Sequence, residues 1–248
     1  MAPYARRGVH GRTVETLARR VLGGEIPEGA TLDLAALRRE LDVSLTALRE
    51  SLKVLAAKGM VDARQKRGTF VRPRADWHLL DADVLRWRLA AGVGAPADRA
   101  LLRDLGEVRV VVEPAAARLA AERRTEADLA ALETALAAMA ASPGGADGPE
   151  GPARAVAADL AFHRGLLAAT HNELLERMEV VIEPGLAHRD TIVHSSPHRA
   201  DPVPSHRAVL DAVRARDRDA AERAMRALLD QSVRDLDRVS RAPDGGTR

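Results

Sequence analysis

The chain has 248 residues, of which 46% are hydrophobic and only 2% aromatic, so it can bury a core packed mainly from leucine, valine and alanine. It has no cysteine, which excludes disulfides, cysteine-ligated zinc and a thiol nucleophile, and it shows neither a signal-peptide pattern nor an apolar run long enough to span a membrane. The net charge of +2 combines +7 in residues 1–75 (15 basic, 8 acidic) with −5 in residues 76–248 (23 basic, 28 acidic). This asymmetry predicts a polyanion-binding module tethered to a second module, in a cytoplasmic protein.

Residues 1–74 are predicted to form three helices followed by a hairpin. Apolar residues recur at helical intervals in RTVETLARRVL, residues 12–22, and a second helix follows in LAALRREL, residues 34–41. Ser44 is placed to cap a third helix, which ends at Gly59. MVDARQKRGTFVRP then predicts two strands joined by a tight turn through Gly68.

The third helix has the features of a helix that reads DNA. It turns leucines inward and projects Thr46, Arg49 and Lys53 outward, and an α-helix fits the major groove. Lys66 and Arg67 lie at the hairpin, where they would reach phosphates or the minor groove. Three helices and a basic hairpin follow the order of a winged helix-turn-helix. The alternative is a small helical domain with ordinary solvated charges.

The segment VSLTALRESLKVLAAKGMVDARQKRGTFV resembles the winged helix-turn-helix of the GntR family of bacterial transcription factors, over about residues 10–73. The resemblance implies that Arg49 contacts DNA and that Gly68 lies at the wing tip. It departs from the family at Leu45 and Ala35, where the family commonly has arginine, so two DNA contacts are missing. The predicted DNA-binding residues are Ser44, Thr46, Arg49, Lys53, Lys66, Arg67 and Gly68.

Residues 75–95 are predicted to form a linker that contains a short helix, capped by Asp81 or Asp83. Trp77 and Trp87 are expected to pack as a joint between the two modules. The next module, residues 96–240, is predicted to be an all-helical bundle, and residues 241–248 a disordered tail. Its predicted helices are 98–122, with a kink at Pro114, then 126–141, 153–170, 172–195 and 205–240, with a loop at 142–152.

Four polar side chains point inward from the predicted bundle: Arg109, Asp159, His163 and His206. Burying each without a partner would cost roughly 1–3 kcal/mol, so they must meet partners, a metal or a ligand. Asp159 and His163, four residues apart, can chelate one cation, and His206 would complete a two-histidine, one-carboxylate set. Such a set suits zinc, manganese, nickel or iron. The alternative is a buried, hydrated Asp–His hydrogen-bond network.

Three further segments, LLRDLGEVRVVVEPAAARLAAERR, DLAFHRGLLAATHN and SHRAVLDAVRARDRDAAERAMRALL, resemble the FCD effector domain of the FadR subfamily, over about residues 98–236. The resemblance implies that the Asp–His positions are metal ligands, but Leu228 replaces a further histidine, which puts a tightly held metal in doubt. Arg109 matches an arginine that reaches the effector carboxylate. The alternative is an internal pair with Glu113 or Asp159. DWHLLDADVLRW is similar to the joint of members that respond to sugar acids.

The sequence thus predicts a mainly α protein, with a winged helix-turn-helix and hairpin wing followed by a helical effector-binding and dimerisation bundle. The predicted function is a repressor that binds an operator in double-stranded DNA as a homodimer and is released by a small carboxylate such as a sugar acid. Its predicted effector-binding residues are Arg109, Asp159, His163 and His206, with one divalent zinc, manganese or nickel ion held by the last three. The alternative is a metal-dependent enzyme. The sequence shows no separate general base and no glycine-rich phosphate loop to support it.

Overall fold

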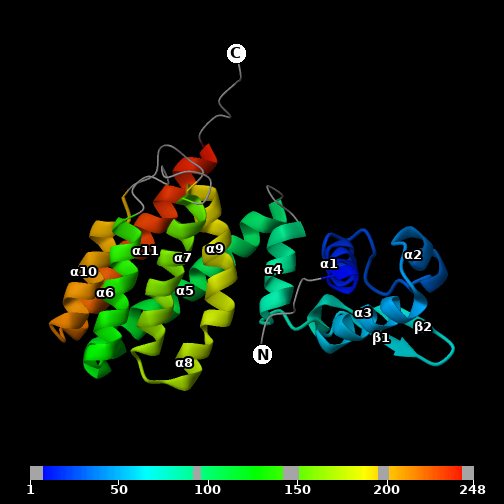
Figure 1. The fold of residues 1–248 in the computed structure, drawn as a ribbon, viewed down its shortest axis with the longest axis horizontal. Helices are drawn as coiled ribbons and strands as arrows, with labels where there is room; N and C mark the ends of the chain where they lie inside the picture. Colours follow the sequence, from blue (N-terminus) through cyan, green and yellow to red (C-terminus); the bar gives the residue numbers. More distant parts are fainter. Residues whose placement is uncertain (1–7, 92–95, 142–150, 195–200, 242–248) are drawn as a thin grey trace, which may run out of the picture. The chain divides into compact units, whose positions relative to one another are not determined.

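A computed structural model describes residues 8–91, 96–141, 151–194 and 201–241, shown as coloured ribbon in Figure 1. Two compact units divide the chain, Met1–Leu101 and Leu102–Arg248. The described ranges are helical apart from turns and one two-stranded antiparallel sheet, which confirms the predicted fold class. No helix in these ranges is both long and apolar enough to cross a membrane.

The first unit follows the predicted order of helices and hairpin. It consists of α1 (Gly8–Leu22), α2 (Leu34–Glu40), α3 (Leu45–Ala57), β1 (Val61–Arg64), β2 (Gly68–Val71), a 3-10 turn (Arg74–Asp76) and α4 (Ala82–Ala91). Asp33 caps α2, and Ser44 caps α3 as predicted. Leu17, Leu48 and Leu55 are almost fully buried and fix α3 against α1, so the exposed face of α3 is set by packing.

Helix α4 packs against α1 and belongs to the first unit. Trp77 and Trp87, expected to form a joint between the modules, are buried core side chains of this unit. The indole Nε1 of Trp77 donates to the carbonyl of Arg72 at 3.0 Å. Asp81 caps α4, since its Oδ1 accepts hydrogen bonds from the backbone N–H of Asp83 at 2.9 Å and of Val84 at 3.2 Å.

A buried ion cluster ties the end of α3 to the start of α4. The Lys58 side chain is 3% exposed, and its ammonium lies 2.7 and 2.8 Å from the two oxygens of Asp81. It also lies 2.9 Å from Oδ2 of Asp83, whose other oxygen accepts from Arg86 at 2.6 Å. Sequence analysis did not predict this role, because Lys58 precedes the helix-ending glycine, where lysine is usually solvated.

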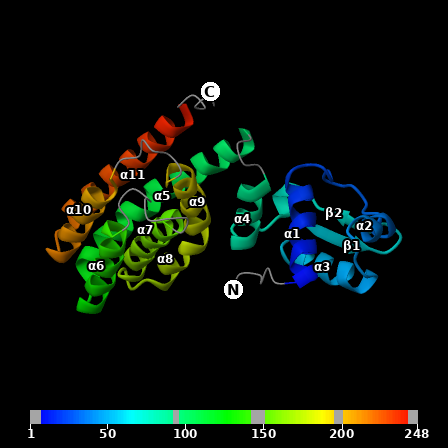
Figure 2. The same ribbon diagram turned by 45° about the horizontal axis from the view of Figure 1, so that its top comes forward.

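The second unit is a helical bundle that holds most of α5. Its helices are α5 (Pro96–Arg123), α6 (Glu126–Ala140), α7 (Gly151–Ala168), α8 (Glu173–Arg177), α9 (Glu179–His194), α10 (Val203–Arg214) and α11 (Arg218–Arg241). Helix α6 packs on α7 and α10, and α11 packs on α10; Figures 1 and 2 show these helices side by side. Leu132, Phe162, Leu210 and Met225 are at most 1% exposed and form the centre of this core.

Three predicted boundaries were wrong. The predicted helix 172–195 is divided at Met178 into α8 and α9. The predicted helix 205–240 is divided at Arg216, which has a left-handed φ of 57°, and Asp217 then caps α11. Neither break is marked by glycine or proline. Helix α7 begins at Gly151, inside the predicted loop 142–152, since proline is tolerated in a first helical turn. Residues 142–150 and 242–248 lie outside the described ranges.

Candidate nucleic-acid interface and buried polar site

Helix α3 presents a polar face to solvent. Thr46, Arg49 and Lys53 are exposed on it, opposite the buried leucines. Lys53 pairs with Glu50 at 2.7 Å, with both side chains more than half exposed. Ser44 uses its Oγ to accept from the N–H of Ala47 at 3.1 Å, so it orders the first turn of the helix. The face that sequence analysis assigned to DNA is therefore rigidly mounted and open.

Leu45 and Ala35 are also exposed, and Leu45 keeps 38% of its surface. Apolar side chains thus stand at the two positions where the resemblance implied arginines. Neither has the donor that would contact a phosphate.

The hairpin has its tip at Gln65–Arg67, because Gly68 is already the first residue of β2 and pairs with Arg64. Lys66 and Gly68 both take left-handed backbone conformations, with φ of 68° and 80°. The guanidinium of Arg67 lies over the Phe70 ring, 3.6 Å from its centroid, and Nη2 donates to the carbonyl of Gly29 at 3.1 Å. Two cations therefore stand at the tip of an ordered wing.

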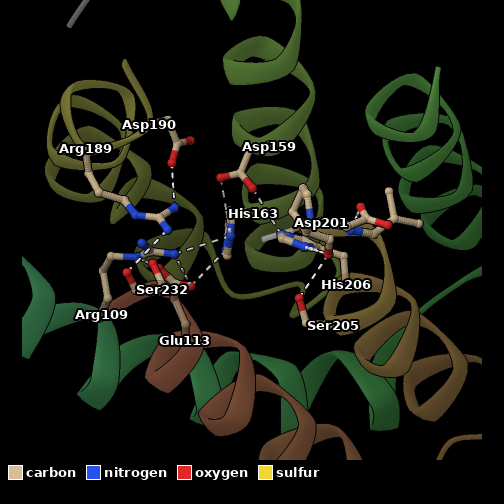
Figure 3. A network of polar contacts seen from close by, with 12 residues as sticks. Arg109, Glu113, Asp159, His163, Arg189, Asp190, Asp201, Ser205, His206 and Ser232 are labelled. Atoms are coloured by element: carbon tan, nitrogen blue, oxygen red, sulfur yellow. Dashed lines mark hydrogen bonds and ion pairs between the residues drawn. The ribbon is translucent and has the colours of Figure 1, made fainter. Parts of the chain in front are cut away.

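Three of the four predicted pocket residues form one group, the Asp–His cluster: Asp159 and His163 on α7 and His206 on α10. Each is at most 5% exposed, and one ligand atom from each lies within 4.8 Å of the others. Oδ1 of Asp159 is 3.1 Å from Nε2 of His206, and Oδ2 is 3.7 Å from Nε2 of His163. Figure 3 shows both rings turned toward the carboxylate.

The hydrogen bonds of His206 orient it as a metal ligand would be oriented. Its Nδ1 lies 2.8 Å from the carbonyl of Pro202, so Nδ1 carries a proton and donates it. In a neutral ring, Nε2 then turns a lone pair toward the Asp159 carboxylate, which is repulsive unless a proton or a cation stands between them. Among the described residues, neither His206 Nε2 nor Asp159 Oδ2 forms a hydrogen bond. The donor set fits a divalent cation.

Arg109 on α5 meets its internal partner in the structure. It is 6% exposed, and it donates from Nε to Oε1 of Glu113 at 2.5 Å and from Nη2 to Oε2 at 3.2 Å. Nη2 also lies 3.3 Å from Nε2 of His163, whose Nδ1 is 2.8 Å from Glu113. Burial raises the pKa of Glu113, but the charges of Arg109 and His163 outweigh it and lower the pKa to about 2.

Sequence analysis missed Asp190, which is 1% exposed and accepts from Nη1 of Arg189 at 2.6 Å. Burial and then the charge of Asp159 raise the pKa of Asp190 well above its usual range. Burial likewise opposes ionisation of Asp159, but the His206 ring 3.1 Å away and the charge of His163 lower its pKa. A helical stripe was the available signal, because Asp190 follows Ile182 and Leu186 at intervals of four.

Leu228 does not offer a polar atom to this site. It is 4% exposed and packs in the apolar core of the second unit. The histidine that the resemblance placed there is replaced by a core side chain.

A pocket lies beside Arg109, between α5, α9 and α11, with a volume of about 480 Å³ when its open mouth is included. It is lined by Leu102, Leu105, Gly106, Arg109, Val110, Gly185, Leu186, Arg189, Leu229, Ser232, Val233 and Leu236.

Comparisons with known proteins divide the chain in the same order. Residues 10–71 match the family described as bacterial regulatory proteins, gntR family, and residues 104–231 match the FCD domain. The galactonate operon transcriptional repressor of Escherichia coli (strain K12) is 33% identical over 232 residues, 92% of this chain and 97% of that protein. The putative L-lactate dehydrogenase operon regulatory protein of the same organism is 31% identical over 199 residues, 78% and 72% of the two chains.

One solved structure, of Lar from work on the agr system of Listeria monocytogenes, aligns with a TM-score of 0.62 and 16% identity. The alignment covers 95% of this chain and 99% of that one. At that identity it supports the fold alone.

Proposed function

The chain belongs to the GntR family of bacterial regulatory proteins and carries an FCD domain, and from this premise we propose how it senses and responds. It is a DNA-binding transcription regulator and not an enzyme. We assign operator binding to residues 1–74, effector sensing to residues 96–240 and the link between them to residues 75–95. The protein acts as a homodimer on a two-fold operator, because two copies of one short reading helix supply the base contacts that one lacks.

The observation that carries the DNA-binding proposal is the exposed face of α3. Thr46, Arg49 and Lys53 project from a helix whose other face is locked in the core, so their positions are set before DNA arrives. Arg49 is the side chain best suited to the two acceptors of guanine in the major groove. Lys66 and Arg67 on the wing supply phosphate contacts.

The test of this assignment is Arg49→Ala in the full-length protein, in a gel shift on the upstream region of its own gene. We expect a loss of affinity of about 5-fold to 150-fold, in line with roughly 1–3 kcal/mol for a bidentate arginine–guanine contact. Arg207→Ala on α10 is the matched control, because Arg207 is an exposed arginine of the second unit. If the two variants bind alike, α3 is not the reading helix.

The proposed effector is a small organic acid whose carboxylate binds Arg109. Two relatives carry names that refer to operons for galactonate and for L-lactate dehydrogenase, which are connected with hydroxy acids. A buried guanidinium binds a carboxylate through paired hydrogen bonds. The contacts of Arg109 with Glu113 and His163 use Nε and Nη2, and Arg109 also lines the pocket between α5, α9 and α11.

Asp159, His163 and His206 would hold a divalent zinc, manganese or nickel ion, and the orientation of His206 supports this proposal. When bound, the ion would add positive charge beside Arg109 for the effector carboxylate. The test is elemental analysis of protein purified without chelator, with His163→Ala as comparison. Metal in the wild type alone supports the site, whereas equal traces in both proteins favour the hydrogen-bond network.

The response requires only a modest energy difference. An effector that reduces operator occupancy tenfold has to favour the non-binding state by about 1.4 kcal/mol. An acid that draws Arg109 away from Glu113 and His163 rearranges a buried ion network. The free-energy change of this rearrangement is large enough to supply the required difference of about 1.4 kcal/mol. The proposed sense is repression relieved by the effector.

A further inference from the structure

The pocket between α5, α9 and α11 combines apolar walls with three side chains that offer hydrogen bonds. The walls are formed by leucines and valines from all three helices. The side chains that offer hydrogen bonds are Arg109, Arg189 and Ser232. Figure 3 shows these three residues near one another.

Arg189 brings a second guanidinium to the pocket. It donates to Asp190 from Nη1 at 2.6 Å and to the backbone carbonyl of Ser232 from Nη2 at 3.3 Å. Its Nε is buried and has no hydrogen-bond partner in the part of the chain that the structure describes. A buried donor of this kind is costly unless a ligand satisfies it.

We infer that this pocket binds a monocarboxylate with an apolar body, held at its carboxylate by Arg109 and Arg189, in preference to a polyhydroxylated acid. The inference rests on the proposed function, and it narrows the chemical class of the effector. Two guanidiniums from different helices can clamp one carboxylate and fix its direction. The hydroxyls of a sugar acid would lie against leucine and valine walls, where they lose their hydrogen bonds to water.

Two glycines shape the space for the apolar body. A Cβ added at Gly106 would meet no atom within 4 Å, so this position on α5 borders open space. A Cβ at Gly185 would come within 2.6 Å of Cδ1 of Leu105, so the glycine lets α9 approach α5 and hold that leucine as a wall. A larger side chain at Gly106 should fill the pocket without disturbing this contact.

The experiment is calorimetric titration of the full-length protein with hexanoate and with gluconate. These two acids have the same number of carbons and the same charge, and they differ in their hydroxyls. We expect hexanoate to bind at least tenfold more tightly than gluconate. Arg189→Gln should weaken hexanoate at least tenfold, whereas Arg207→Gln, which changes an exposed arginine, should leave it unchanged.

Gly106→Leu should abolish hexanoate binding, and Gly106→Ala, which adds only a Cβ, should retain it. Both variants should fold, because alanine and leucine favour helix more than glycine does, and circular dichroism checks this. Gluconate binding as tight as hexanoate, no binding of either acid, or wild-type hexanoate binding by a folded Gly106→Leu would overturn the inference. The titration contains no DNA, so its failure is distinct from loss of operator binding in the gel shift.

Discussion

Replacement of Lys58 by methionine is expected to destabilise the first unit by about 3–5 kcal/mol, the usual cost of breaking a buried ion pair by removing one partner. Methionine keeps most of the apolar stem of lysine and removes the ammonium. The change leaves Asp81 and Asp83 without a cation that lies within 2.9 Å of both. The side chains of these carboxylates are 19% and 4% exposed, so water replaces little of what is lost.

Arg86 moderates the loss, because it still contacts Asp83 at 2.6 Å. Within the described ranges, Lys58 is the cation that pairs with Asp81, and Asp81 also caps α4. We therefore expect a value near 3 kcal/mol, the lower end of the range for a broken buried pair. A unit of this size is held together by only about 5–15 kcal/mol, so the change removes a fifth or more of its stability.

Tryptophan fluorescence during urea unfolding of the full-length protein is the assay. Trp77 and Trp87 are the two tryptophans of the chain, and both are buried in the first unit, so fluorescence follows this unit while circular dichroism follows both. With a urea dependence of about 1–3 kcal/mol per molar, the fluorescence midpoint should fall by about 1 M or more.

Lys53→Met is the matched control. Its lysine is 73% exposed and pairs with Glu50 on the helix surface, where water screens the contact. A fluorescence midpoint for Lys58→Met within error of the Lys53→Met midpoint would refute the reasoning. In that case the buried ammonium contributes no more than a solvated one.

Three further predictions concern other positions. Leu45→Arg places a cation on an exposed site of α3, so it should tighten binding to non-cognate duplex. It should also steepen the slope of log K against log salt concentration by about 1, measured by fluorescence anisotropy. An unchanged slope would show that this position does not face phosphate. Leu228→His should raise the metal content of protein dialysed against zinc, and equal content in the two proteins would place residue 228 outside the ligand set. Because the pKa of Glu113 falls to about 2 when the protein folds, its ionised form adds stability above pH 4.5 that is lost as the pH falls toward 2. The stability difference between wild type and Glu113→Gln, from urea unfolding followed by circular dichroism, should therefore be largest above pH 5 and shrink below pH 4; a gap independent of pH would contradict the assigned ionisation.

Local signals in the sequence predicted much of the fold. Ser44 before an apolar-periodic run marked the start of α3, and Asp81 was one of the two predicted caps of α4. The division of the last two predicted helices was not predictable in this way. Arg216 turns the chain with a left-handed backbone that arginine rarely adopts, and tertiary packing rather than local preference selects it.

The polar site was predictable only in part, for a similar reason. Helical periodicity identified which side chains point inward, and the structure brings Asp159, His163 and His206 together. Periodicity does not say which inward groups meet across helices. The pairing of Arg109 with Glu113 was one of two open alternatives, and Asp190 was missed although it follows Ile182 and Leu186 at helical intervals.

The stacking of Arg67 on Phe70 has a kinetic consequence. A free arginine explores many rotamers. Fixing one of them on association costs about 2 kcal/mol in free energy, because side-chain entropy is lost. Here the aromatic ring and the carbonyl of Gly29 already confine the guanidinium in the unbound protein. In the DNA-binding role proposed for the wing, an approaching duplex would meet one charge already in place, and less side-chain ordering would remain for the encounter.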